Sequence, residues 1–319
     1  MSNLPQQSST TPPRSDNMSA NGLSLLKHGI LVIGNGHMGL GLAQLGAAHG
    51  INVRILCRTN ATSNVARTKL KARIARNAAK GIIPLEESKN IASRITFCTE
   101  LETLTTDAQS KHGCAFEERF VIETITESMT AKQEIIHNVS SQMHEDCLFA
   151  TNTSSLSVRT LAEACRKQEQ FLGMHFFNPP TQMELVEIVR HGKLDATYLQ
   201  YARVIAQHLS KEVIVVNDSP GFASSRLGIV QGLEAMRMLE QGVSSAEEID
   251  KAMTFGYKHP VGPLKLTDMV GLDIRLKIAE HLYRSLGGDQ FRPPQILKDM
   301  VADGRLGRKS GQGFYTWDR

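Results

Sequence analysis

Long apolar runs are missing from this 319-residue chain, which is also poor in cysteine and in aromatic residues. A membrane-spanning helix needs about 20 consecutive apolar residues, so the sequence predicts no membrane segment. The N-terminus lacks the apolar stretch of a secretory signal peptide. The five cysteines are odd in number and show no metal-ligand spacing, so we predict no metal site. We interpret them as reduced thiols of a cytosolic, cytoplasmic protein.

A strong charge of either sign is also missing. The formal net charge is +4, and 21% of the residues are charged while 41% are hydrophobic. These values are typical of a globular protein. No stripe of alternating aromatic and basic residues indicates binding to nucleic acid. A chain of this length can form a large domain and a smaller one.

The first 26 residues differ in composition from the rest of the chain. They are rich in Ser, Thr, Pro, Gln and Asn and show almost no apolar periodicity, so we predict a disordered tail at residues 1–26. A transit peptide fits poorly because basic residues are scarce there, although the serine content leaves that alternative open.

A glycine-rich motif follows the first apolar run of the chain. The run at residues 28–33 predicts a buried strand, and it leads into GNGHMG, a helical segment at 40–48 and a second strand at 51–56. This strand, turn, helix and strand order is the context in which G-x-G-x-x-G indicates a dinucleotide site. The predicted cofactor contacts are Gly34, Gly36, His37, Met38 and Gly39.

The residues after the second predicted strand indicate which cofactor binds. An acidic residue usually accepts hydrogen bonds from the adenosine ribose at this point, but here the chain has Cys57 and Arg58. Without a carboxylate to repel a 2′-phosphate, and with Arg58 and Thr59 to bind one, we predict NADP rather than NAD. The alternative is that Arg58 only stacks on the adenine and that both cofactors serve.

The segment at 66–80 is predicted to be a helix with many basic residues. The basic residues are Arg67, Lys69, Lys71, Arg73, Arg76 and Lys80, and no residue of the segment is acidic. Such a surface binds an anion, either the phosphates of coenzyme A or an acidic carrier protein. The alternative is an ordinary solvated helix face.

Polar residues follow several predicted strands that lie further along the chain. Glu127 follows the strand at 120–124, the sequence TNTSS follows the strand at 147–150, and His175 ends a strand near residue 171. The carboxyl ends of strands in an open α/β sheet meet at the ligand site, so we expect these residues near the nicotinamide.

His175 and Glu187 lie twelve residues apart, on either side of a turn formed by Asn178 and two prolines. If the flanking segments are strands, the imidazole and the carboxylate meet. A carboxylate orients an imidazole and keeps it basic, which suits a general base near neutral pH. The alternative is a buried histidine with a satisfied hydrogen bond.

Residues 27–217 are therefore predicted to form a Rossmann-type doubly wound sheet, and residues 218–319 a smaller all-helical C-terminal domain. In the second segment, apolar residues recur with helical spacing between Leu227 and Leu239. Apolar helix faces in a domain of this size also suit a subunit interface.

An ordered set of motifs resembles the L-3-hydroxyacyl-CoA dehydrogenase family. The motifs are GNGHMG at 34–39, TNTSS at 151–155, HFFNP at 175–179 with Glu187, SPGF at 219–222, PVGP at 260–263 and GRKSGQGFY at 307–315. The resemblance extends from about residue 28 to residue 317.

The resemblance implies a Rossmann-type domain, an all-helical domain and a homodimer formed through the helices. It implies that His175 and Glu187 are catalytic and that Ser154 and Asn178 lie beside the substrate hydroxyl and the cofactor. Further implied cofactor contacts are Glu127, Lys132 and Lys309, and the implied coenzyme A contact is Lys80, to which the basic helix adds Arg73. Two positions depart from the family: Cys57 replaces the ribose-binding aspartate, and Ser225 replaces a substrate-side asparagine.

The implied reaction interconverts a 3-hydroxyacyl thioester and the 3-oxoacyl thioester. Two enzymatic alternatives keep the same fold: a carrier-protein-bound hydroxyacyl group, or a free hydroxy acid or sugar acid. The third alternative is a non-catalytic binding or structural protein on a dehydrogenase scaffold. The His175/Glu187 pair argues against the third, because a scaffold needs no base beside its cofactor.

Overall fold

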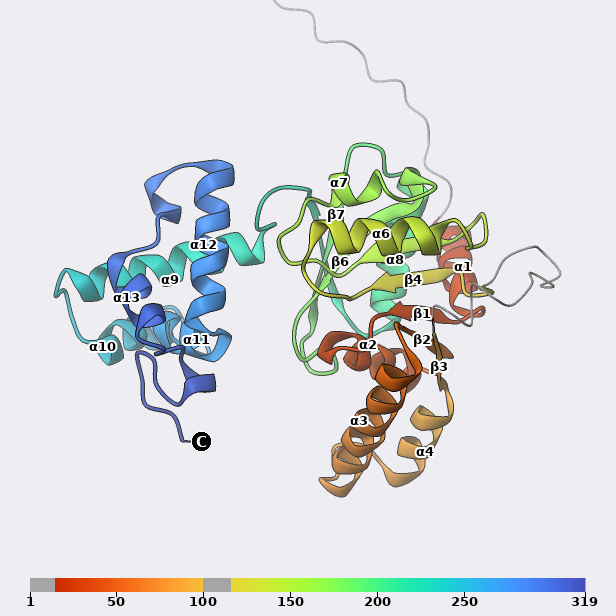
Figure 1. Cartoon of the computed structure of the whole chain (residues 1–319), viewed down its shortest axis with the longest axis horizontal. Coiled ribbons are helices and arrows are strands. Elements are labelled where there is room, and N and C mark those ends of the chain that lie inside the picture. The colour runs from red at the N-terminus through yellow and green to blue at the C-terminus, as the bar shows by residue number, and fades with distance from the viewer. Residues whose placement is uncertain (1–14, 100–115, 319) are drawn as a thin grey trace, which may run out of the picture. The chain divides into compact units, whose positions relative to one another are not determined.

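A computed structural model describes residues 15–99 and 116–318 of the chain. The described residues divide into two compact units (Figure 1). The first contains the chain up to Thr153 together with Val158–Asn217, and the second contains Ser154–Ser157 and the chain from Asp218 onward. The division after residue 217 coincides with the end of the predicted first domain, whereas residues 154–157 group with the second unit.

The first unit is built on an eight-stranded sheet with the order β3-β2-β1-β4-β5-β6-β7-β8. The strands are β1 Ile30–Ile33, β2 Val53–Cys57, β3 Ile95–Thr99, β4 Phe120–Glu123, β5 Leu148–Thr151, β6 Phe171–Phe176, β7 Leu185–Arg190 and β8 Glu212–Asn217. Every neighbouring pair is parallel except β6 and β7. The first six strands have the Rossmann order, which confirms the predicted fold class.

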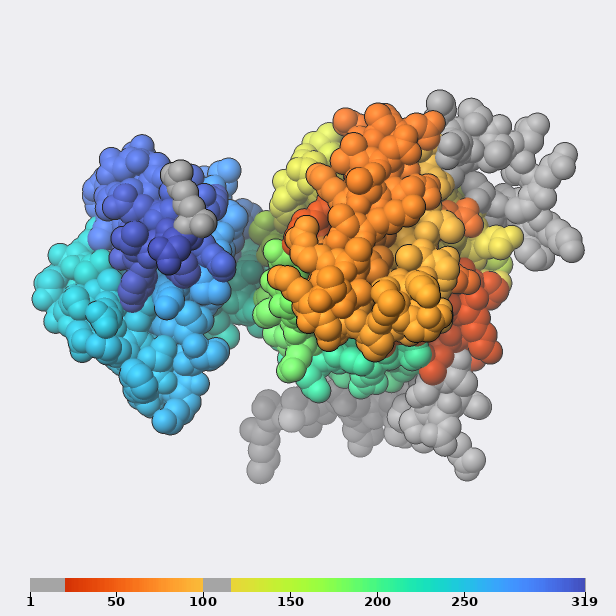
Figure 2. Space-filling view, turned by 90° about the horizontal axis from the view of Figure 1, so that it is seen from below, coloured from red at the N-terminus to blue at the C-terminus, as the bar shows by residue number. Residues whose placement is uncertain are grey.

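Helices connect the strands, as expected for a largely parallel sheet. They are α1 Ser15–Leu26, α2 His37–Ala48, α3 Asn60–Ala79, α4 Leu85–Ser93, α6 Met129–Ser140, α7 Val158–Ala162 and α8 Ala196–His208, with a 3-10 turn at Gln168–Gln170. The central strands β1, β4 and β5 are buried along their whole length, which explains their continuous apolar sequences. Helices α3 and α4, drawn in orange, form the face of this unit seen in Figure 2.

The predicted disordered tail is too long. Residues 15–26 form α1, which packs against α8, and Leu25 and Leu26 are buried in the core. A Cβ atom at Gly22 would lie 3.1 Å from the Cβ of Val204 on α8. The packing of α1 against α8 stabilises the short apolar end of α1. Because α8 is distant in sequence, the polar composition of the tail gives no sign of this packing. Residues 1–14 lie outside the described residues.

The second unit contains helices around its own core, as predicted. The helices are α9 Ser224–Glu240, α10 Ala246–Lys251, a π-helical turn Ala252–Gly256, α11 Pro263–Val270, α12 Leu272–Leu286 and α13 Gln295–Ala302, with 3-10 turns at Asp289–Phe291 and Arg308–Ser310. Leu233, Leu264 and Leu282 are among the buried residues of the core. Within the described ranges, no helix is both long and apolar enough to cross a membrane.

Candidate active site

The glycine motif forms the turn between β1 and α2. Gly34 has a φ of +108°, and a Cβ atom there would lie 2.9 Å from the Thr124 hydroxyl. A Cβ atom at Gly39 would lie 2.1 Å from the carbonyl oxygen of Gly34, so only glycine lets α2 pack this closely. A Cβ atom at Gly36 would meet nothing within 4 Å, so this position is open.

The start of α2 suits a phosphate group. Gly36 is the N-cap residue and supplies no side-chain hydrogen bond, and the first turn of α2 contains no acidic residue. Gly36 and His37 are exposed. Unpaired amides and the helix dipole favour an anion at such a position. The open glycine position and the helix start therefore fit the pyrophosphate of a dinucleotide.

The end of β2 has no carboxylate, and the thiol that replaces it lies in the core. Cys57 is only 1% exposed, and burial raises the pKa of its thiol. Arg58 is exposed beside the start of α3, whose first turn contains no acidic residue. Thr59 is the N-cap of α3, and its hydroxyl accepts a hydrogen bond from the Thr62 amide. The side chain that remains available for a phosphate here is therefore Arg58.

A buried ionic network connects the carboxyl ends of β4 and β5. Lys132 is fully buried on α6, and its Nζ lies 2.7 Å and 2.8 Å from the carboxylate oxygens of Glu123. The Thr151 hydroxyl donates to Glu123 at 2.6 Å because the two residues are paired across the sheet. The network reaches the surface at Glu127, which lies 3.6 Å from Lys132 and accepts a hydrogen bond from Thr153 at 2.6 Å.

This network differs from the expectation that Lys132 contacts a cofactor directly. Its ammonium group is fully buried and pairs with the carboxylate of Glu123, which is fully buried as well. The lysine is therefore not exposed to a cofactor. Lys132 instead holds Glu127, which is the exposed carboxylate of the group. The sequence prediction missed Glu123. The sequence FVIE has a carboxylate at the end of an otherwise apolar strand, and this pattern could have indicated a buried, paired glutamate.

His175 and Glu187 face each other across the antiparallel pair β6 and β7. His175 Nδ1 lies 2.7 Å from a carboxylate oxygen of Glu187, and both residues are buried, with exposed fractions of 5% and 0%. The ring of Phe177 lies 4.6 Å from the imidazole. Because Nδ1 is paired with a carboxylate, Nε2 is the ring nitrogen that can exchange a proton with a substrate.

The polar residues that follow β5 and β6 fall into both units. Asn152 accepts a hydrogen bond from the amide of Phe176 at 2.8 Å, which ties the end of β5 to the end of β6. Asn178 is exposed in the turn after β6 and precedes a cis peptide bond to Pro179. Ser154 is also exposed, but it belongs to the second unit.

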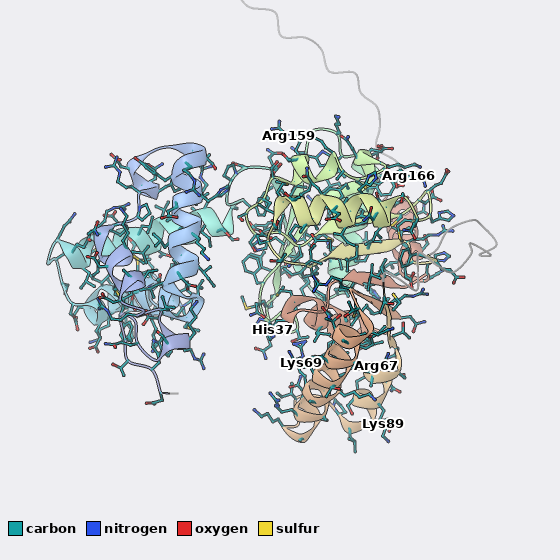
Figure 3. All side chains as sticks on the ribbon, in the orientation of Figure 1. His37, Arg67, Lys69, Lys89, Arg159 and Arg166 are labelled. Atoms are coloured by element: carbon teal, nitrogen blue, oxygen red, sulfur yellow. The ribbon has the colours of Figure 1, made fainter. Side chains whose placement is uncertain are left out.

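The predicted basic residues of α3 do not form one cluster. Arg67 stacks on Phe97 of β3 at 4.7 Å, and Lys80 is exposed at the C-cap of the helix. Arg73 is half-buried, and its Nη2 atom has no hydrogen-bond partner among the residues that the structure describes. A Cβ atom at Gly41 would lie 3.6 Å from Arg73 Nη2 and 2.6 Å from Pro180, so Arg73 lies beside the turn that follows His175. Figure 3 shows where Arg67 and Lys69 leave α3 and where His37 leaves α2.

The remaining predicted residues lie in the second unit. Lys309 is exposed and forms an ion pair with Asp273 of α12. Partial burial raises the pKa of Asp273, but the hydrogen bond from Lys309 and its positive charge lower it by more. The pKa of Asp273 therefore lies below its ordinary value. Ser225 lies in the first turn of α9.

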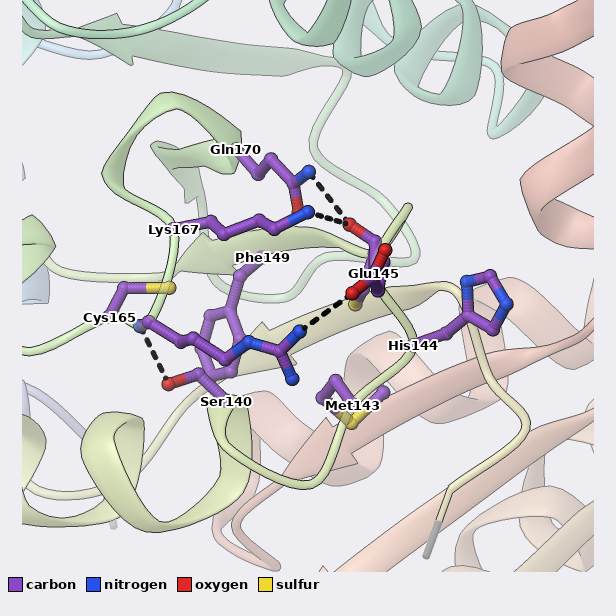
Figure 4. A pocket seen from close by; sticks show the side chains of 10 residues that line it. Ser140, Met143, His144, Glu145, Phe149, Cys165, Lys167 and Gln170 are labelled. Atoms are coloured by element: carbon purple, nitrogen blue, oxygen red, sulfur yellow. Dashed lines mark hydrogen bonds and ion pairs between the residues drawn. The ribbon is translucent and has the colours of Figure 1, made fainter. Parts of the chain in front are cut away.

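Two surface pockets lie at the opposite edge of the sheet. One is a cavity of about 20 Å³ near the amino ends of β5 and β6, which has room for about one water molecule (Figure 4). There, Arg166 and Gln170 both bind Glu145, through its carboxylate and its carbonyl oxygen. The other is larger, about 430 Å³, and lies near the amino ends of β1, β2 and β3. Neither is lined by His175.

Comparison with known proteins shows similarity over nearly the whole described chain. The profile of the 3-hydroxyacyl-CoA dehydrogenase NAD binding domain matches residues 29–219, and the profile of the C-terminal domain of the same enzymes matches residues 221–317. A probable 3-hydroxybutyryl-CoA dehydrogenase of Bacillus subtilis is 35% identical over 289 residues, which cover 91% of this chain and 97% of the relative.

A mitochondrial hydroxyacyl-coenzyme A dehydrogenase of Sus scrofa is 32% identical over 294 residues, which cover 92% of each chain. Among solved structures, the (S)-3-hydroxybutyryl-CoA dehydrogenase of Ralstonia eutropha matches with a TM-score of 0.82 and 33% identity. The match covers 92% of this chain and 99% of that structure.

Proposed function

Because the chain belongs to the 3-hydroxyacyl-CoA dehydrogenase family, we propose that it interconverts a 3-hydroxyacyl thioester and the 3-oxoacyl thioester. The observation that supports this proposal most directly is the buried hydrogen bond between His175 and Glu187. It gives an oriented imidazole at the carboxyl end of a strand, where a Rossmann-type sheet binds its ligands.

His175 acts as the general base in the proposed oxidation. Its Nδ1–H donates to Glu187, so Nε2 removes the proton of the 3-hydroxyl group while the carboxylate stabilises the imidazolium that forms. In the reverse direction the imidazolium returns the proton to the oxygen. A nicotinamide cofactor would supply the hydride acceptor for the oxidation and the hydride donor for the reduction. Ser154 and Asn178 hold the reacting oxygen or the thioester.

The residues that would hold the cofactor fit a dinucleotide. The open turn at Gly36 and the start of α2 would bind the pyrophosphate. Glu127 would contact the cofactor, and Lys132 and Thr153 hold the carboxylate of Glu127 in its orientation. Lys309, already paired with Asp273, is a further proposed contact.

We propose that NADP(H) is preferred over NAD(H). Arg58 is exposed at the start of α3, with a helix dipole beside it and no carboxylate to repel a phosphate. Comparison of kcat/KM with NADPH and NADH tests this preference. A clear preference for NADH would contradict it.

Coenzyme A is the proposed carrier of the acyl group. Arg73 lies half-buried beside the turn after His175, and its Nη2 atom has no hydrogen-bond partner in the described part of the chain. Exposed basic residues of α3 and Lys80 at its end add to this positive charge. These cations suit the phosphates of coenzyme A.

A homodimer through the helical unit is proposed as well, since Phe255 and Tyr257 there are more than 70% exposed. Light scattering would test the dimer.

The decisive experiment follows the nicotinamide absorbance with acetoacetyl-coenzyme A and each reduced cofactor. Turnover would establish the reaction and the cofactor together. Lack of turnover with both cofactors would contradict the proposed substrate, and acetoacetyl groups on a carrier protein and free hydroxy acids would then be tested in the same assay.

A further inference from the structure

Lys211 is a buried lysine at the edge of the sheet where β6 ends. Only 7% of the residue is exposed, and it directly precedes β8, which is parallel to β7 and pairs Glu212 with Leu185. Because β7 runs antiparallel to β6, the starts of β7 and β8 lie beside the end of β6. Lys211 therefore lies at the same edge of the sheet as His175, and both residues belong to the first unit.

The ammonium group of Lys211 binds the turn that connects β6 and β7. Its Nζ donates to the carbonyl oxygen of Pro180 and to that of Met183, each at 2.7 Å. Within the turn, the amides of Gln182 and Met183 both donate to the carbonyl oxygen of Pro179. Hydrogen bonds from a charged donor are stronger than those between neutral groups. The lysine therefore adds two strong contacts to the turn's own hydrogen bonds.

Helix α2 contacts the same turn. A Cβ atom at Gly41 of this helix would lie 2.6 Å from Cγ of Pro180, so the glycine lets the helix approach the turn closely. Pro180 is buried, whereas Asn178, two residues earlier, is exposed. The turn is therefore fixed at Pro180 by Lys211 and α2, and it presents Asn178 at the surface.

Burial of this lysine is unfavourable by itself. Removal of the ammonium group from water lowers the pKa of Lys211, and the charge of Glu184 raises it by less. An ammonium group has three N–H donors and no acceptor, so carbonyl oxygens are suitable partners. An apolar side chain at this position would leave both carbonyl oxygens without the lysine donor, which is costly for a buried acceptor. The turn would then shift toward other partners.

We propose that Lys211 is a positioning residue that acts through this turn on Asn178. The turn begins directly after β6, so its conformation sets where Asn178 stands relative to His175, three residues earlier. A displacement of about 1 Å in a group that holds the substrate can lower the rate about 10²-fold. This inference rests on the proposed function and adds a residue that acts without touching the substrate.

The test compares Lys211→Met with the wild-type protein, using acetoacetyl-coenzyme A and the reduced cofactor that supports turnover. The kcat should fall about 10–10²-fold, while the Kd for the cofactor should stay the same, because the glycine turn keeps its own contacts. Lys211→Gln should lose less turnover, because its amide can still donate to one carbonyl oxygen. Lys193→Met, which changes an exposed lysine beyond the end of β7, is the control and should keep the wild-type kcat.

A double-variant cycle separates positioning from general stabilisation of the fold. Lys211→Met should lower kcat far less in an Asn178→Ala background than in the wild-type protein, because the group that the lysine positions is then missing. Equal losses in both backgrounds would overturn the inference. A folded Lys211→Met variant with the wild-type kcat and only a lower free energy of unfolding would overturn it as well.

If Lys211→Met does not fold, the same cycle with Lys211→Gln decides between these outcomes. The wild-type protein distinguishes failure of the inference from failure of the proposed function. Turnover by the wild-type protein together with equal losses in the cycle would overturn the inference alone. Lack of turnover of acetoacetyl-coenzyme A by the wild-type protein with both reduced cofactors would overturn the proposed function and the inference with it.

Discussion

At the scale of single residues, the site depends on side chains that have lost contact with water. His175 and Glu187 are both buried, and the 2.7 Å contact between them holds the imidazole in one tautomer. Lys132 and Glu123 form a second buried pair, which supports the exposed carboxylate of Glu127. Each pair is stable because both partners are present, so removal of one partner should have a large effect.

Replacement of His175 by alanine should remove most turnover, by about 10²–10⁴-fold, because the imidazole that we propose as the general base is then missing. The affinity for the cofactor should stay the same, since the glycine turn is a separate part of the sheet. Steady-state kinetics and cofactor titration measure the two quantities. His137→Ala, which changes an exposed histidine of α6, is the control. Turnover close to that of the wild-type protein would exclude His175 as the base.

Replacement of Glu187 by glutamine keeps the shape of the pair but removes its negative charge. We expect lower turnover and a shift of the pH profile to lower pH, because a neutral amide no longer stabilises the imidazolium. The profile of kcat/KM against pH measures the shift. If the profile were unchanged, the carboxylate would have only a structural role.

Replacement of Lys132 by methionine leaves the buried carboxylate of Glu123 without its counter-charge. Breaking a buried ion pair in this way costs about 3–5 kcal/mol, so the free energy of unfolding should fall by that order. Chemical denaturation measures the change. The double variant Lys132→Met/Glu123→Gln should recover a large part of the loss. No recovery would show that packing of the lysine chain, and not its charge, stabilises the site.

At the scale of elements, the two edges of the sheet have different roles. The carboxyl ends of β1, β4, β5 and β6 carry the glycine turn, the ionic network and His175. The amino edge carries Glu118, which pairs with Arg54 of β2 at 2.7 Å. Within residues 15–99 and 116–318, the second carboxylate oxygen of Glu118 is buried without a hydrogen-bond partner. Stability of this edge should therefore depend on pH.

Burial raises the pKa of Glu118 above its ordinary value of 4.5, although the charge of Arg54 acts in the opposite direction. An acid with a raised pKa in the folded state stabilises the protein fully below its unfolded pKa, and this contribution is lost as the pH rises through the folded pKa. Glu118→Gln, which stays neutral, should therefore gain stability relative to the wild-type protein as the pH rises from about 4 toward neutrality. Denaturation at several pH values measures the difference, and a difference that is constant with pH would contradict the prediction.

At the scale of the whole molecule, the chain divides its tasks between two units with separate cores. The first unit contains the glycine turn, Arg58 and the His175/Glu187 pair. The second contains Ser225, Lys309 and the buried Arg275, and residues 154–157, which lie between two segments of the first unit in sequence, also belong to it. The proton-transfer pair belongs to the first unit.

Local sequence determined much of this arrangement. The strands, the glycine turn and the order of motifs follow from short-range patterns of apolar residues and glycine, because these patterns reflect backbone preferences of neighbouring residues. The family resemblance was confirmed for the same reason, since its motifs are short and ordered. The spacing of His175 and Glu187 also allowed their pairing to be expected before the register of β6 and β7 was known.

Only the tertiary structure decided which polar groups are enclosed and which partners they meet. It placed Lys132 behind Glu127, turned Cys57 into the core, packed α1 against α8 and buried Arg275 with no hydrogen-bond partner for its Nε atom among the described residues. In each case the outcome depends on residues that are distant in sequence. Burial and pairing are properties of the packed chain, whereas a sequence pattern reports only on the preferences of its own segment.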